Sequence, residues 1–88
     1  MSIQKPLREQ VLTLSAAYSK KVGKSEARLG TIIRNHGSFF RNMRRGGDCT
    51  TRNAESTVQW FSNNWPDDLP WPKDIVRPAP DPVSDDRK

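Results

Sequence analysis

The chain has 88 residues, of which 15 are Lys or Arg and 10 are Asp or Glu, so its formal net charge is +5. This length supports one small domain, and the single cysteine, Cys49, excludes an intramolecular disulfide and any metal site built from cysteines alone. No apolar run approaches the roughly 20 residues that span a bilayer, and the first ten residues are too polar for a signal peptide, so we expect a cytoplasmic protein without a membrane partner.

The first predicted helix covers residues 6–22. Its apolar side chains recur at steps of three or four residues, which is the spacing of one helix face: Leu7, Val11, Leu14, Tyr18 and Val22. Pro6 suits the first turn, where its missing N–H is not needed, and Gly23 suits a left-handed stop. This face is therefore expected to pack on the core.

The second predicted helix begins after Ser25, whose hydroxyl can cap it, and ends near Arg34. The following Asn35-His36-Gly37 has the composition of a turn. The apolar side of this helix is expected to consist of Ala27, Leu29, Ile32 and Ile33.

The third predicted helix is short and covers residues 39–45, with Ser38 as its cap and Gly46-Gly47 as its stop. Two helices joined by a tight turn are typical of the helix-turn-helix, whose second helix enters the major groove of DNA. Phe39, Phe40 and Met43 are expected to anchor this helix inward, because their exposure would create a large apolar patch.

Arginine and asparagine dominate the remaining positions of this third helix. Arg can bond bidentately to guanine and Asn to adenine, so we expect these side chains to contact base edges. The predicted base-reading residues are Ser38, Arg41, Asn42, Arg44 and Arg45. Phosphate contacts position a protein on the duplex, and the predicted backbone contacts are Lys24, Arg28, Arg34, His36, Thr50, Thr51 and Arg52. An ordinary solvated basic face is the alternative interpretation.

A fourth helix is expected to begin at a cap formed by either Thr50 or Thr51 and to stop at Trp65-Pro66, because a residue before proline disfavours helical geometry. Its apolar stripe consists of Ala54, Val58, Phe61 and Trp65. Six of the seven prolines lie at or beyond position 66, so the rest of the chain is expected to be extended.

Together these elements predict an all-α fold with three parts: a four-helix helix-turn-helix domain over residues 6–65, a proline-rich extended segment over residues 66–77 that packs back on the domain, and a disordered tail over residues 78–88. Leu69, Trp71, Ile75 and Val76 are the apolar residues that suggest the return. Residues 1–57 carry 11 basic and four acidic side chains, and residues 58–88 carry four basic and six acidic ones. A positive body of this kind suits a polyanion, because neutralising phosphates releases counterions.

Several of these features resemble phage-repressor-like, lambda-type helix-turn-helix proteins of alphaproteobacteria and their prophages. They are Gly23-Lys24-Ser25, Leu29-Gly30, the apolar anchor between Phe39 and Met43, Gly46-Gly47, and the Thr-started helix that ends at Trp65-Pro66. The resemblance covers about residues 10–72 and implies a four-helix DNA-binding fold that regulates transcription, often as a dimer. The turn Asn35-His36-Gly37 departs from the usual compact turn of that family.

We therefore predict a sequence-specific regulator of transcription that binds duplex DNA as a homodimer, associates with the nucleoid, and is not an enzyme. No cofactor, metal or small-molecule substrate is expected. The alternative is a protein-interaction adaptor of a mobile element, such as an antitoxin-like protein, whose partner would bind the proline-rich tail and exposed tryptophans.

The remaining reactive or aromatic residues suggest no catalytic site. His36 has no Cys or carboxylate at metal-ligand spacing, and Cys49 with His36 lacks a third, orienting group. Trp60, Trp65 and Trp71 could stack on single-stranded bases, but core packing is the expected role of the last two. Trp60 is a candidate for a dimer contact or for a contact with the tail.

Overall fold

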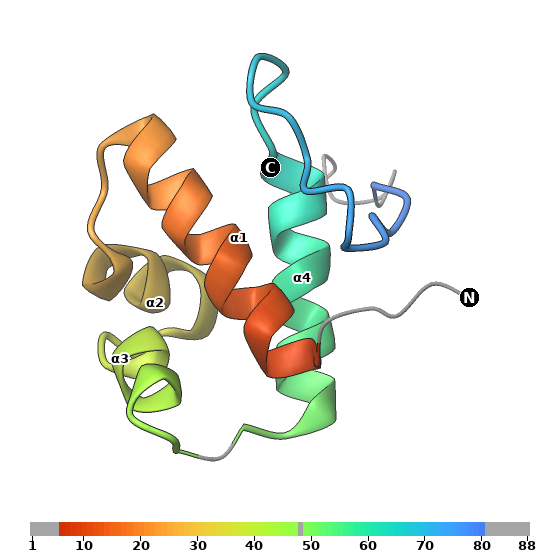
Figure 1. Cartoon of the computed structure of the whole chain (residues 1–88). Helices are drawn as coiled ribbons and strands as arrows, with labels where there is room; N and C mark the ends of the chain where they lie inside the picture. Colours follow the sequence, from red (N-terminus) through yellow and green to blue (C-terminus); the bar gives the residue numbers. More distant parts are fainter. Residues whose placement is uncertain (1–5, 48, 81–88) are drawn as a thin grey trace.

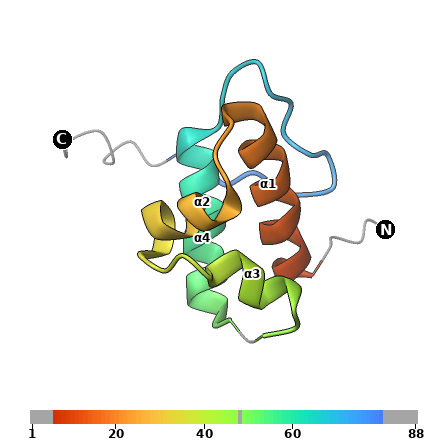
Figure 2. The same ribbon diagram turned by 90° about the vertical axis from the view of Figure 1, so that its left-hand side faces the viewer.

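Helix boundaries in the protein follow the cap and stop residues of the sequence closely. The computed structural model describes residues 6–47 and 49–80, and within these ranges the fold is all-α, with no strand. The four helices are α1 (Leu7–Val22), α2 (Glu26–Arg34), α3 (Phe39–Arg44) and α4 (Thr51–Asn64). α1 and α4 lie side by side, while α2 and α3 cover one side of this pair (Figures 1 and 2). None of these helices is long and apolar enough to cross a bilayer.

Three of the predicted caps are present. Gly23 ends α1 in the left-handed conformation with φ 73°, and its N–H donates to the Ser19 carbonyl at 2.9 Å. The Ser25 hydroxyl accepts a hydrogen bond from the Arg28 N–H at 3.1 Å at the start of α2. At α4, the Thr50 hydroxyl accepts one from the backbone N–H of the third helical residue at 3.1 Å, so Thr50 rather than Thr51 is the cap.

Two expectations for α3 were wrong. The helix ends at Arg44, one residue earlier than predicted, and Arg45 occupies the C-cap position. Ser38 forms no side-chain cap hydrogen bond, because its φ of −98° and ψ of 8° depart from the extended backbone that a capping serine adopts. The first turn of α3 is instead fixed by a backbone bond from the Phe39 N–H to the His36 carbonyl at 3.1 Å.

The core lies between the four helices and the C-terminal segment. Its buried hydrophobic residues are Val11, Leu14, Leu29, Phe39, Phe40, Met43, Ala54, Val58, Phe61, Trp65 and Ile75. The predicted stripe of α4 is therefore buried throughout, and Val11 and Leu14 of α1 are fully buried, with Leu7 and Tyr18 packed against them. Tyr18 contacts the rings of Trp60 and Phe61, each at 5.5 Å between ring centroids, so Trp60 packs against α1.

The predicted apolar side of α2 was only partly correct. Leu29 is buried and Ile33 half-buried, but Ala27 is exposed and Ile32 is 46% exposed. At about 100° of rotation per residue, the buried positions Leu29, Gly30 and Ile33 form one face, and Ile32 lies roughly 110° from its centre. The apolar residues of α2 therefore do not share one face.

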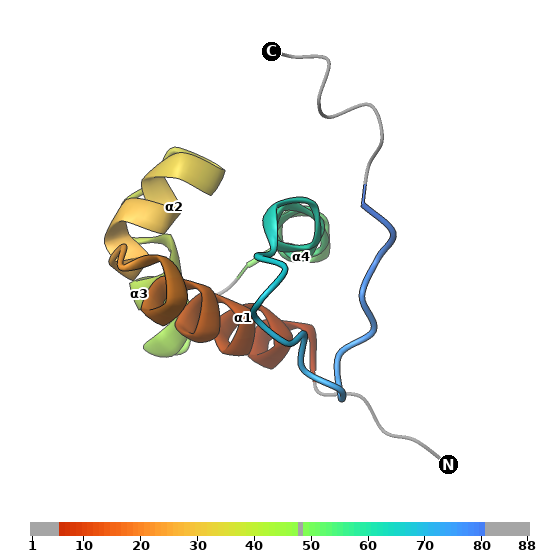
Figure 3. The same ribbon diagram turned by 90° about the horizontal axis from the view of Figure 1, so that it is seen from above.

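Residues 66–80 cross over the ends of α1 and α4 and then descend along α4, on the side opposite α2 and α3 (Figures 1 and 3). The two tryptophan N–H groups fix this path: Trp65 Nε1 donates to the Leu69 carbonyl at 2.7 Å, and Trp71 Nε1 to the Ile75 carbonyl at 2.8 Å. The centroids of the Trp65 and Trp71 rings lie 4.9 Å apart, and Ile75 is only 2% exposed. The segment thus completes the core.

The C-terminal segment contacts α4 beyond residue 77, in the part of the chain that the sequence assigned to a disordered tail. The Ser62 hydroxyl donates to the Pro78 carbonyl, and Gln59 Nε2 donates to the Ala79 carbonyl at 2.9 Å. These bonds hold residues 78 and 79 against α4, because buried and half-buried polar groups of that helix find their acceptors there. The predicted disorder over residues 81–88 lies outside the described residues.

Candidate nucleic-acid interface

The turn between α2 and α3 is set by a close backbone approach at Gly30. Asn35 adopts the left-handed conformation with φ 56°, and the His36 N–H donates to the Gly30 carbonyl at 3.1 Å. A Cβ atom on Gly30 would lie 2.5 Å from the backbone oxygen of His36. Gly30 therefore allows the chain to fold directly back over α2 and start α3.

α3 is anchored by the three side chains that the sequence predicted. Phe40 is fully buried, Met43 is 2% exposed and Phe39 is 8% exposed. The rings of Phe39 and Phe40 meet edge-to-face with their centroids 5.0 Å apart, and the centroid of the Phe40 ring lies 6.2 Å from that of Phe61 in α4. Beyond the helix, Arg8 of α1 donates to the backbone carbonyl of the second glycine in the stop. The short helix is thus held along its inner face and at its end.

Three of the predicted base-reading side chains face solvent. Arg41, Asn42 and Arg45 are exposed, and none forms a side-chain hydrogen bond or ion pair with another residue in ranges 6–47 and 49–80. Two positive charges and one carboxamide therefore project from a rigidly anchored element. This combination can donate bidentate hydrogen bonds to an acceptor-rich partner.

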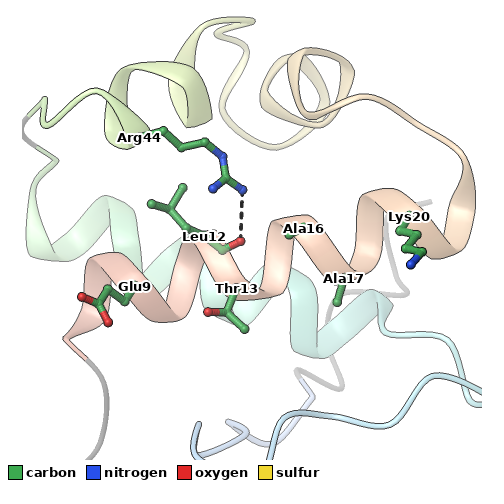
Figure 4. A pocket seen from close by; sticks show the side chains of 7 residues that line it. All are labelled: Glu9, Leu12, Thr13, Ala16, Ala17, Lys20 and Arg44. Carbon is green, nitrogen blue, oxygen red and sulfur yellow. Dashed lines mark hydrogen bonds between the residues drawn. The ribbon is translucent and has the colours of Figure 1, made fainter.

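Arg44, the fourth predicted reader on this helix, has a different role. Its guanidinium donates to both carboxylate oxygens of Glu26 on α2, with Nε to Oε1 at 2.9 Å, and also reaches the Leu12 carbonyl of α1 at 3.5 Å (Figure 4). The same carboxylate accepts a hydrogen bond from the fully buried Ser15 hydroxyl at 2.7 Å. Arg44 therefore joins three helices, and its guanidinium already has internal partners, although its side chain is 44% exposed.

Helix geometry explains why Arg44 differs from its neighbours. Four residues advance about 400°, so Arg44 lies roughly 40° around α3 from the buried Phe40, on the edge of the inward face. Arg41 and Arg45 lie near the opposite side. The ion pair joins residues 18 positions apart on separate helices, so no local sequence signal could have identified it.

Electrostatics supports the structural role of this pair. Hydrogen bonding from Arg44 lowers the pKa of Glu26 below its ordinary value of 4.5, with further lowering by Ser15 against the opposing effect of burial. In turn, hydrogen bonding to Glu26 raises the pKa of Arg44. Both groups are therefore charged at neutral pH.

Two of the predicted backbone-contacting residues also have internal partners. Arg34 of α2 donates to Asn53 Oδ1 at 2.7 Å and to the Ser56 hydroxyl at 3.2 Å, which links α2 to α4. Thr50 accepts the cap bond of α4, although its side chain remains exposed. The other five, all exposed, are Lys24, Arg28, His36, Thr51 and Arg52.

The described residues hold no metal-ligand cluster, and the one cysteine has a thiol that is harder to ionise than usual. Within the described residues, no three side chains of His, Cys, Asp or Glu are grouped as metal ligands. Burial raises the pKa of the Cys49 thiol, although nearby arginines act in the opposite direction. The raised pKa disfavours the nucleophilic thiolate.

Comparison of the chain with protein-family models, curated proteins and solved structures finds no match.

The Glu26 pair gives a pH-dependent prediction. Because the pKa of Glu26 is lowered by folding, its contribution to stability is present above the unfolded pKa near 4.5 and is lost as the pH falls through the folded pKa. We expect Glu26→Gln to reduce the free energy of unfolding by about 1 kcal/mol at pH 7 and to have much less effect near pH 3. Urea unfolding followed by tryptophan fluorescence at both pH values measures the difference.

The matched control is Glu55→Gln, which neutralises an exposed carboxylate of α4. This variant should have nearly the same stability as the parent protein at both pH values. An equal loss from Glu26→Gln at pH 7 and pH 3 would contradict the role assigned to the ion pair.

Proposed function

We propose that the protein is a helix-turn-helix regulator of transcription that binds duplex DNA sequence-specifically, with α2 as the supporting helix and α3 in the major groove. It would act as a homodimer in the cytoplasm, on DNA of the nucleoid, without a cofactor, a small-molecule substrate or an enzymatic activity. The resemblance to phage-repressor-like proteins, noted from the sequence, points in the same direction.

The proposal depends chiefly on the two faces of α3. Phe39, Phe40 and Met43 fix its inner face, while Arg41 and Asn42 project outward with the adjacent Arg45. A rigid mount matters because base discrimination requires donors held in fixed positions; a flexible basic loop would bind phosphates without reading sequence. Arg44 and Glu26 support this mount as positioning residues.

Exposed polar groups around α3 would contact the DNA backbone. Lys24 and Arg28 lie near the start of α2, His36 lies in the turn, and Thr51 and Arg52 begin α4. The first backbone N–H groups of α4 and its positive dipole end also favour a phosphate. Each such contact would strengthen binding to any sequence and make it depend on salt.

Alanine substitutions should separate the two classes of contact. After a preferred site has been selected from random duplexes, Arg41→Ala or Asn42→Ala should cost about 1–3 kcal/mol on that site and relax the preference at one base pair. Lys24→Ala should weaken preferred and random duplexes alike. Fluorescence anisotropy at fixed salt measures both, with Lys73→Ala in the C-terminal segment as the control. Equal losses on both duplexes for Arg41→Ala and Asn42→Ala would argue against base reading.

The adaptor alternative makes a different prediction. Its proposed binding elements are partly occupied within the protein, since Trp65 is buried and Trp71 is half-buried against it. Val76 of the same segment, at 63% exposed, remains accessible to a partner. For a DNA-binding protein, the logarithm of affinity should fall with the logarithm of salt concentration at a slope of about −0.9 per phosphate contact. An adaptor should show no binding to random duplex in a gel-shift assay at any salt concentration.

A further inference from the structure

The outward face of α1 carries a groove that the proposed DNA contacts do not use. The groove has a volume of about 570 Å³ and runs along α1, with Arg44 of α3 at its edge (Figure 4). Six residues of α1 line it: Glu9, Leu12, Thr13, Ala16, Ala17 and Lys20. Past Lys20, a second hollow of about 440 Å³ continues to Leu69. In the single chain Glu9, Ala16 and Lys20 are exposed, and the other three α1 residues are half-buried.

The two ends of the groove carry opposite charges. Glu9 lies at one end and Lys20 at the other, both exposed, and between them lie one leucine and three smaller side chains. The two charges are eleven positions apart on the helix, or roughly 16 Å along its axis, so they cannot pair within one chain. Neither side chain has a hydrogen-bond or ion-pair partner within residues 6–47 and 49–80, so each charge is available to an opposite charge on another molecule.

We propose that this face binds a second copy of the chain, with α1 packed antiparallel against α1 of the partner about a two-fold axis. With the axis midway between residues 14 and 15, positions equidistant from that point face each other. Glu9 then faces Lys20 of the second copy, Leu12 faces Ala17, and Thr13 faces Ala16. Every contact occurs twice, as an isologous interface requires.

The properties of the groove favour a second copy over an unrelated partner. An antiparallel arrangement pairs both ends with opposite charges, whereas a parallel arrangement would place Glu9 against Glu9 and Lys20 against Lys20. Ala16 and Thr13 at the centre permit a close approach of the two helix axes, since that distance depends on the side chains at the contact. Leu12 supplies an apolar contact on either side of the centre.

The two-fold symmetry also suits the proposed function. Only this part of the inference, the placement of both α3 helices toward one duplex, rests on that function. A two-fold axis perpendicular to α1 and lying in the interface leaves α2 and α3 of both copies on the same side of the paired α1 helices, because α2 and α3 lie to one side of the groove (Figure 4). Both α3 helices could then approach one duplex, in the arrangement that two-fold DNA sites require.

A charge swap tests the interface. Sedimentation equilibrium without DNA should show a monomer–dimer equilibrium for the parent protein. Glu9→Lys and Lys20→Glu should each raise the dimer dissociation constant by roughly tenfold, because two attractive contacts become repulsive. The double variant E9K/K20E should restore most of the affinity, since the opposite charges face each other again.

Steric and charge controls complete the design. Ala16→Arg should abolish the dimer and leave the helical circular dichroism unchanged, because Ala16 is exposed in the single chain. Its melting temperature should equal that of the parent protein at concentrations where the parent is a monomer. Glu55→Lys and Lys73→Glu make the same charge changes elsewhere and should leave the dimer intact. A monomer at every concentration, or a dimer insensitive to Ala16→Arg and the swap, would overturn the proposal. Because DNA is absent, neither result depends on the DNA-binding assays.

Discussion

Replacing Gly30 with alanine is expected to lower the free energy of unfolding by about 2–4 kcal/mol. The added Cβ would lie 2.5 Å from the backbone oxygen of His36 and 3.5 Å from the Cβ of Phe39. Backbone rather than a flexible side chain blocks it, so the whole turn must shift. The usual gain of about 1 kcal/mol from replacing a helical glycine with alanine cannot offset this clash. Urea unfolding followed by circular dichroism measures the loss.

Gly37→Ala is the matched control within the same turn. Its Cβ would meet the Thr31 side-chain hydroxyl at 3.3 Å, and that group can move by a few tenths of an ångström. We therefore expect a change within about 0.5–1 kcal/mol. If Gly30→Ala were tolerated as well as Gly37→Ala, the close approach at residue 30 would not determine how α3 is placed.

Ile75→Asp is expected to cost about 3–5 kcal/mol, a large fraction of the stability of a domain this small. Ile75 is 2% exposed, and an ionised carboxylate cannot remain in that site without a partner. We expect the segment to detach from the core and the Trp71 ring to move away from Trp65. A red shift of tryptophan fluorescence at low denaturant, together with the lower unfolding midpoint, would report both effects.

The neighbouring residue provides the control. Val76 is 63% exposed, so Val76→Asp makes the same kind of change one position along the chain without burying a charge. Its stability should stay within about 0.5 kcal/mol of the parent protein. If both variants were equally stable, the return of the C-terminal segment would contribute little to the fold.

Sequence reasoning predicted the helices well where periodicity and terminal residues agreed. The α4 stripe from Ala54 to Trp65 and the stops at Gly23 and Trp65 need only local information. The predictions were wrong where tertiary contacts determine the backbone conformation or the burial of a residue. Ser38 has the right side chain for a cap, but its backbone is held in another conformation by the turn. Ile32 is apolar, yet the buried face of the short α2 runs from Leu29 through Ile33 to Gly30, and Ile32 lies on the other side of Leu29 and is exposed.

The candidate site was predicted in composition but not in detail. The anchoring role of Phe39, Phe40 and Met43 follows from side-chain hydrophobicity and helical spacing, and the structure confirms it. Arg44 could not be separated from the other arginines, because its partner Glu26 meets it only through the packing of α2 against α3. Long-range polar pairs of this kind leave no periodic signal in a single sequence.

The brevity of α3 has a thermodynamic consequence. Six residues are far fewer than the ~12–15 that an isolated helix needs to persist in water, so the element carrying Arg41 and Asn42 exists only in the intact domain. Under the proposed function, DNA recognition and folding form one coupled equilibrium. A cognate duplex at a hundred times its dissociation constant would add about 2.7 kcal/mol to the native state, so a variant weakened far from α3 would regain its order on the correct sequence and lose it elsewhere.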